Sequence, residues 1–258
     1  MKPYCAVVLG MLLVSHSFAA RADAGFWAGA EYLHWEEKTS PKVTEKGPIF
    51  AFGFNWTQAK AEGLVFAYQG KLYTGSVKYE GALLFSPSTP VTGTTQYTGM
   101  QHEGQLRLRK SKSDYTIDPY VGLGVNNWNR ELSAVQREVY TVFYASAGLQ
   151  FDRPQAHGLT GGFGVRYAFY IDENAYFRDL GYDNNPHLKP KGQVSAFANV
   201  GYRFKNNLEL SGYYESIRFN DSDPVSVSQN GAAAGAFYQP GSKLDILGLR
   251  LQYRFAVN

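Results

Sequence analysis

The sequence predicts an all-β fold: an up-and-down antiparallel transmembrane β-barrel of ten strands, with eight or twelve strands as alternatives. Ten segments alternate apolar and polar residues with the period of two that is typical of β-strands. The links between these segments alternate between short and long, which is typical of barrels that cross a membrane. No stretch after the N-terminal region approaches the eighteen apolar residues of a membrane helix.

Residues 1–24 have the layout of a secretory signal peptide. A cation at Lys2 precedes an apolar run at residues 6–14, and an Ala-x-Ala pattern closes the segment. The run is too short to cross the ~30 Å hydrocarbon core of a bilayer as a helix. We expect cleavage after Ala24, with Ala19 and Ala20 as alternative sites, and a single barrel domain over residues 25–258.

Composition narrows the class further. The only cysteine, Cys5, lies in the predicted signal peptide, so the exported chain has no disulfide and must be stabilised by other means, such as strand pairing. The chain holds 19 Tyr and 17 Phe, yet its mean hydropathy is −0.32, which excludes a helical membrane protein. A net charge of +3 gives no indication of nucleic-acid binding.

The ten predicted strands can be read directly from the alternation. In the last one, apolar Leu247, Leu249 and Leu251 and aromatic Tyr253 and Phe255 alternate with glycine and polar residues. We expect the apolar set to face lipid and the polar set to face the barrel interior. The strands are expected at residues 26–36, 48–57, 63–79, 97–109, 115–130, 139–152, 158–172, 191–204, 208–220 and 242–255.

The links place the strand ends on the two sides of the membrane. Links after even-numbered strands are short, as in "KSKSD" and "KNN", and links after odd-numbered strands are generally longer, as in "ENAYFRDLGYDNNPHLKPK". Barrels of the outer membrane have short periplasmic turns and long external loops. Both termini are therefore predicted on the periplasmic side.

The final residues "GLRLQYRF" resemble the C-terminal strand of bacterial outer-membrane β-barrel proteins, and "GFWAGAEYLHW" is similar to the first strand of small OmpA-like barrels. The resemblance implies a location in the bacterial outer membrane, among outer-membrane lipid and lipopolysaccharide. It also implies that Tyr253 and Phe255 belong to a signal read by the barrel-assembly machinery. The chain departs from the pattern by three residues that follow Phe255.

Enzymes form an alternative class, because the omptin surface proteases also have ten strands. That family's resemblance would imply paired acids and an Asp–His couple at the outer rim. His34 and His187 can lie outside, but neither has an Asp at near spacing in the sequence. The His-x-Ser arrangement of lipid A deacylases has no match either, so we predict a protein that is not an enzyme, with no catalytic, cofactor-binding or metal-binding residues. A soluble lipocalin-like carrier, with its apolar side chains turned inward, is a further alternative.

Charged residues on the inward period predict a charge network inside the barrel. Acids and bases are nearly balanced, so we expect the side chains to pair across the narrow interior and largely fill it. A narrow pore with a weak preference for anions is the alternative. The predicted network consists of Glu31, Lys71, Glu103, Arg107, Arg109, Asp118, Arg130, Arg166, Asp172, Arg203, Glu209, Glu215, Arg250 and Arg254.

Overall fold

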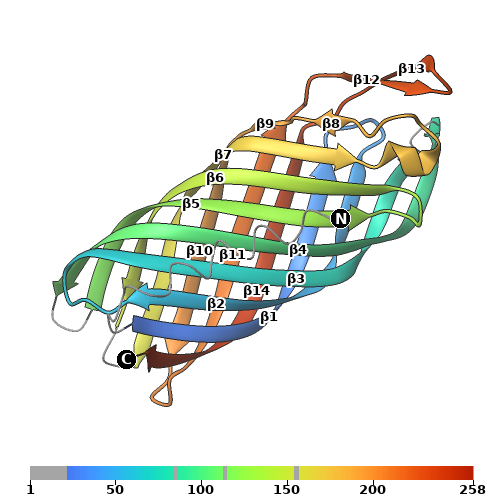
Figure 1. The fold of residues 1–258 in the computed structure, drawn as a ribbon. Helices are drawn as coiled ribbons and strands as arrows, with labels where there is room; N and C mark the ends of the chain where they lie inside the picture. The colour runs from blue at the N-terminus through green and yellow to red at the C-terminus, as the bar shows by residue number, and fades with distance from the viewer. Residues whose placement is uncertain (1–21, 84–85, 113–114, 154–156, 258) are drawn as a thin grey trace.

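Ten long antiparallel strands close into a barrel in a computed structural model that describes residues 22–83, 86–112, 115–153 and 157–257 (Figure 1). Each strand pairs with the next, and the last returns to the first, which leaves no free edge. The predicted count of ten is therefore confirmed. The strands are β1 (Ala22–Glu37), β2 (Val43–Gln58), β3 (Gly63–Leu83), β4 (Ser86–Lys112), β5 (Tyr115–Glu131), β6 (Arg137–Asp152), β7 (Gly158–Ala175), β10 (Val194–Arg203), β11 (Leu208–Asn220) and β14 (Ser242–Val257).

The two ends of the barrel differ, and we call them the turn end and the loop end. At the turn end β2 is followed closely in sequence by β3, β4 by β5, β6 by β7 and β10 by β11, and there the first residues of β1 pair with the last residues of β14. The loop end has the links 38–42, 132–136, 176–193 and 221–241. The remaining link there is shorter than expected, because β4 begins at Ser86 instead of residue 97 and continues its ladder with β3.

The two longest links contain structure of their own. The first holds a 3-10 helix, η3 (Phe177–Leu180), and the short strands β8 (His187–Leu188) and β9 (Lys191–Gly192), which extend the barrel sheet beside β7 and β11. The second holds the hairpin β12 (Val225–Gln229) and β13 (Ala232–Phe237), which stands at the loop end in Figure 1. No helix of the described chain is long and apolar enough to cross a membrane.

A continuous apolar surface encircles the outside of the barrel, and we call it the lipid belt. Phe50 is 69% exposed and Leu249 is 63% exposed, although both are large and apolar. A soluble protein rarely exposes such a contiguous surface. The belt covers about nine residues of β14, which at ~3.4 Å per residue and a ~40° tilt gives about 23 Å of height, close to the ~25 Å of known membrane barrels. Its largest members are Phe26, Phe50, Phe52, Leu64, Phe66, Leu72, Leu106, Leu108, Val121, Leu123, Leu159, Phe163, Val165, Val194, Val200, Leu210, Leu247, Leu249 and Leu251.

The belt confirms the predicted facing of its strands and excludes the lipocalin-like alternative, in which the apolar side would face inward. It also places the barrel wall in lipid, since only closed sheets satisfy every backbone group there.

Towards the loop end the polarity of the wall inverts. On the outside, β1 changes from Tyr32 to His34, and β14 changes from Leu247 to Asp245. Ion pairs form on this outer surface, where Arg218 Nη2 lies 2.9 Å from Asp245 Oδ1. On the inside the same strands now place Leu33, Trp35 and Leu244, which are at most 2% exposed. This half is built like a soluble barrel and therefore lies outside the hydrocarbon.

Glycines on the inner wall make room for aromatic rings. A Cβ atom at Gly53 would overlap the indole of Trp27, and one at Gly248 would overlap the ring of Tyr213. Because the rings lie flat over the glycines, the narrow interior accommodates large side chains at these positions.

Substitution on the outer wall should report the position of the membrane. We expect Leu249→Arg to destabilise the barrel by about 2–4 kcal/mol, because it places a charge on the lipid face. Gln96→Arg, also on the outer face but above the belt, should change the free energy of unfolding by less than about 0.5 kcal/mol. Urea unfolding of both variants in lipid vesicles measures this, and equal costs would contradict the assigned belt.

Candidate functional site: a filled lumen in three layers

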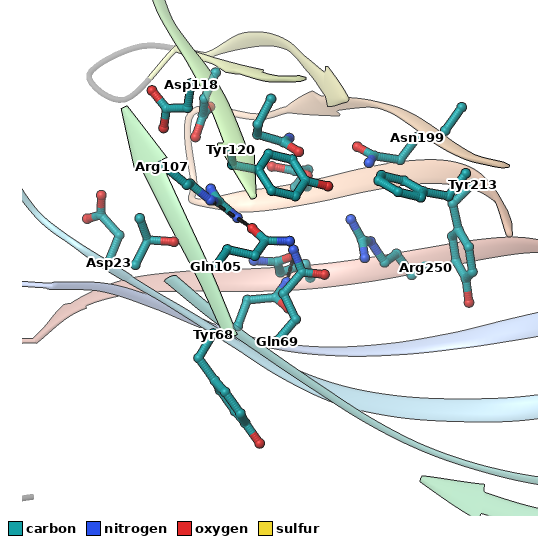
Figure 2. A pocket seen from close by; sticks show the side chains of 18 of the residues that line it. Asp23, Tyr68, Gln69, Gln105, Arg107, Asp118, Tyr120, Asn199, Tyr213 and Arg250 are labelled. Atoms are coloured by element: carbon teal, nitrogen blue, oxygen red, sulfur yellow. Dashed lines mark hydrogen bonds between the residues drawn. The ribbon is translucent and has the colours of Figure 1, made fainter. Parts of the chain in front are cut away.

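The interior near the turn end is a polar pocket of about 100 Å³. Figure 2 shows Arg107, Gln105 and Arg250 pointing into it, with Asp118 and Tyr120 above Arg107 in this view. Arg107 Nη2 donates to Gln105 Oε1 at 2.6 Å, whereas Arg109 forms a forked pair with Asp118, with Nη2 to Oδ2 at 2.8 Å. The hydrogen bonds hold the guanidinium groups in fixed positions.

Further ion pairs connect the strands that form the wall of this pocket. Asp152 accepts hydrogen bonds from Arg203 at 2.5 Å and from Arg254 at 2.9 Å, and Arg254 also reaches Glu209 at 2.6 Å. Four groups from β6, β10, β11 and β14 are therefore tied together, across strands that are distant in sequence. A network of this kind makes the turn end of the barrel more rigid.

The next layer is centred on a buried lysine. Lys71 Nζ lies 3.0 Å from Glu31 Oε1 and 3.1 Å from Glu215 Oε2, and Tyr213 donates its hydroxyl to Glu31. Arg166 joins Glu103 to the same cluster at 3.4 Å. Removing one member would leave a charge buried without a counter-ion, so these groups depend on one another.

Above the charges, four rings close the lumen, and we call them the aromatic plug: Trp35, Trp128, Tyr140 and Phe219, each at most 1% exposed. Trp128 stacks on Tyr140 with ring centres 4.7 Å apart, and Trp35 contacts Tyr140 and Phe219 with centres 5.6 Å apart. They belong to one buried apolar cluster with Leu33, Ile49 and Leu244. Water and ions meet a packed hydrocarbon layer here.

A single guanidinium lies directly above the plug. Arg130 contacts Glu45 at 2.7 Å, Glu138 at 2.6 Å and Glu37 at 3.0 Å, and its guanidinium lies 5.1 Å from the ring of Trp35. Glu45 also accepts from Thr95 at 3.0 Å and from Tyr97. We call Arg130, Glu37, Glu45 and Glu138 the Arg130 cluster. Three carboxylates thus share one base.

The loop end opens into a cavity of about 590 Å³, the vestibule. Its rim is formed by the links 38–41, 132–136 and 237–240. Glu37, Glu138 and Glu173 line it together with Arg130 and Lys38, so acids outnumber bases on its inner surface. The aromatic plug separates it from the polar pocket.

The structure places all but one of the predicted network residues inside the barrel. The exception is Asp172, which was expected to face inward. A β-bulge in β7, opposite Phe143 and Tyr144, leaves both Phe169 and Tyr170 outside and reverses the alternation beyond them. Ile171 and Glu173 consequently point inward and Asp172 outward, so the predicted inward facing of Asp172 is wrong.

The same bulge brings Asp172 to a histidine. His187 Nδ1 lies 3.0 Å from Asp172 Oδ2, although fifteen positions separate the two in sequence. The sequence-based statement that His187 has no Asp near it therefore does not hold in space. The pair faces outward, and the His187 side chain is 55% exposed. It is not among the residues that line any of the cavities described above.

Sequence reasoning missed the acids near the loop end, namely Glu37, Glu45, Glu138 and Glu173, together with Asp152 at the turn end. Glu45 lies just before the predicted second strand, and Glu138 lies just before the sixth. The signal that could have found them is the continued alternation of "VTEKG" and "REVYT", which extends both strands beyond the apolar segment.

An acidic side chain joins the two longest links at the loop end. Asp183 accepts backbone N–H groups of Gly231 and Asn230, each at 3.0 Å, and thereby joins the link after β7 to the β12–β13 hairpin. These backbone donors, first that of Gly231, lower the pKa of the Asp183 carboxyl. Beneath this contact, Phe177, Val227 and Phe237 form a small apolar cluster, with the two phenyl rings 4.7 Å apart.

Comparisons with known structures indicate which class of fold this is. The structure is similar to the outer membrane protease OmpT from Escherichia coli, with a TM-score of 0.52 and 10% identity over 91% of this chain and 96% of that one. The chain has the fold of an outer-membrane β-barrel. The translocator domain of the autotransporter NalP from Neisseria meningitidis is also similar, with a TM-score of 0.40, 10% identity, and coverage of 97% and 96%. No family model and no curated protein matches the sequence.

Proposed function

We propose that this outer-membrane barrel is a closed surface scaffold: it spans the bacterial outer membrane, conducts no solute, and holds its loop end rigidly outside the cell. The aromatic plug is the observation that carries this proposal. A conducting barrel needs a continuous polar path, and wide channels use about sixteen strands. In this chain ten strands enclose a lumen that is filled with paired charges and buried rings.

The ordered links support the surface role. The link after β7 and the β12–β13 hairpin share hydrogen bonds and an apolar cluster, so the loop end presents a defined surface. A non-enzymatic role fits this arrangement, because the Asp172–His187 couple faces outward from the wall. An omptin-like or lipid-modifying enzyme would require reactive groups that converge on a cavity.

Assembly in the membrane belongs to the same proposal. Tyr253 and Phe255 lie at the turn end of β14, where Phe255 and Phe26 have ring centres 5.8 Å apart. We expect the assembly machinery to recognise this strand, and the belt to contact lipid and lipopolysaccharide. Among the predicted cleavage sites, Ala19 and Ala20 lie outside the described residues, and Ala24 lies in β1 opposite Phe255.

Conductance across a planar bilayer tests the closed lumen. Purified wild-type protein should give no current steps, whereas Trp35→Ala combined with Trp128→Ala should give small steps, because it removes two of the four rings that close the lumen. A variant that replaces Leu247 with Ala, on the outer wall, should remain silent. Regular steps from the wild-type protein would overturn the proposal.

A further inference from the structure

The vestibule at the loop end contains more carboxylates than bases. Glu37, Glu138 and Glu173 line it, and Glu45 lies beneath them on Arg130. Arg130 is the base in their midst, and Lys38 is an exposed base on the rim. Four acids face these two bases, and burial raises the pKa of two of the acids, Glu138 and Glu173. Because the walls are protein, solvent screens the charge of the ionised acids weakly.

Among these four acids, Glu173 has the fewest hydrogen-bond and ion-pair partners. It is 1% exposed, and its Oε2 has no hydrogen-bond partner among the described residues. The three other acids all contact Arg130, whereas Glu173 forms no ion pair with a described residue within 4 Å. Tyr140 supplies one hydrogen bond to this carboxyl, but burial and then Glu138 raise its pKa. A cation that reached the unpaired oxygen would stabilise the ionised form through a strong hydrogen bond.

The size and lining of the vestibule favour an organic cation over a metal ion. A cavity of about 590 Å³ lies within the range for small-molecule sites. Tyr79 and Tyr238 also line it, and the faces of aromatic rings attract positive groups. In the described part of the chain, no three His, Cys, Asp or Glu side chains converge as metal ligands.

We propose that the vestibule binds a linear organic cation that carries an ammonium or guanidinium group, with Glu173 accepting the hydrogen bond of that group. The acids of the Arg130 cluster supply the attracting field. The ligand reaches the site from the loop end and does not pass through the barrel, so the site is independent of whether the lumen conducts.

Calorimetric titration of the refolded full chain in detergent micelles tests the site. The probes are the blocked peptide acetyl-Ala-Arg-Ala-amide, free spermidine, the neutral peptide acetyl-Ala-Gln-Ala-amide and calcium chloride. We expect saturable binding of the arginine peptide, of spermidine or of both, and not of the neutral peptide. Binding of the peptide alone identifies a peptide ligand, and binding of spermidine alone identifies a polyamine. Binding by neither, or by calcium alone, overturns the proposal.

Glu173→Gln keeps the size of the side chain and removes its charge. Since a hydrogen bond to a charged group contributes about 1.5–3 kcal/mol, affinity should fall about tenfold or more. Glu80→Gln, on the outer wall beside Lys78, is the matched control and should leave affinity unchanged. Equal losses in both variants, or no loss in Glu173→Gln, contradict the assignment.

A second variant keeps the test decisive if Glu173→Gln fails to fold. Gln136 lies on the rim of the vestibule, and Gln136→Lys adds a competing positive charge there while every residue of the Arg130 cluster is kept. Affinity for the cationic probe should fall severalfold at low salt, and the loss should shrink as salt screens the added charge. Unchanged affinity would overturn the proposal.

Discussion

Replacing Arg130 with Met should destabilise the barrel by about 3–5 kcal/mol, since it leaves several buried carboxylates without their counter-ion. Arg130 is 2% exposed and contacts Glu37, Glu45 and Glu138. Methionine fills much of the same volume, so the loss measures charge and not a cavity. Urea unfolding in lipid vesicles at neutral pH provides the free energy.

A double variant tests whether the loss of stability comes from the unpaired buried charge. Adding Glu45→Gln to Arg130→Met should recover part of the loss, because one buried charge is then removed. Lys78→Met on the outer wall, where Lys78 pairs with Glu80 and is 61% exposed, should cost less than about 1 kcal/mol. An Arg130→Met barrel as stable as the wild type would show that the cluster does not hold the loop end together.

Trp35→Ala should cost about 3–5 kcal/mol, because it leaves a cavity in the centre of the aromatic plug. Trp35 is 0% exposed, contacts three other rings and donates its indole N–H to Glu37 at 3.0 Å. Phe50→Ala in the lipid belt is the control and should cost less, because lipid chains occupy the space left by the ring. Equal costs would show that the interior of this half is loosely packed.

The fold could be predicted because its signal is local. Alternation within a strand reports two faces with different surroundings, and the apolar run of β14 from Leu247 to Phe255 carries that signal without any long-range information. The number of strands followed by counting such segments. The lengths of β3 and β4 could not be predicted in the same way. Their ends beyond the lipid belt lack the apolar outward-facing residues by which the alternation was recognised.

The interior could be predicted only where the alternation is unbroken. The bulge at Phe169 and Tyr170 adds one residue to β7, and nothing in the local sequence marks it, so Asp172 was assigned to the wrong side. The aromatic plug was missed for another reason. Trp35, Trp128 and Phe219 lie at inward-facing positions, but the inward-facing residues change from polar to apolar along each strand. Only the assembled barrel shows that these changes occur at the same level along the barrel axis.

That change of polarity determines how deeply the protein can sit in its membrane. Sinking by two residues along β14 would draw Asp245 into hydrocarbon, and rising by the same distance would expose Leu247 to water. Both displacements are costly, so the barrel has one preferred depth. The mouth of the vestibule is consequently kept at a constant height above the bilayer surface while the protein diffuses laterally in the membrane.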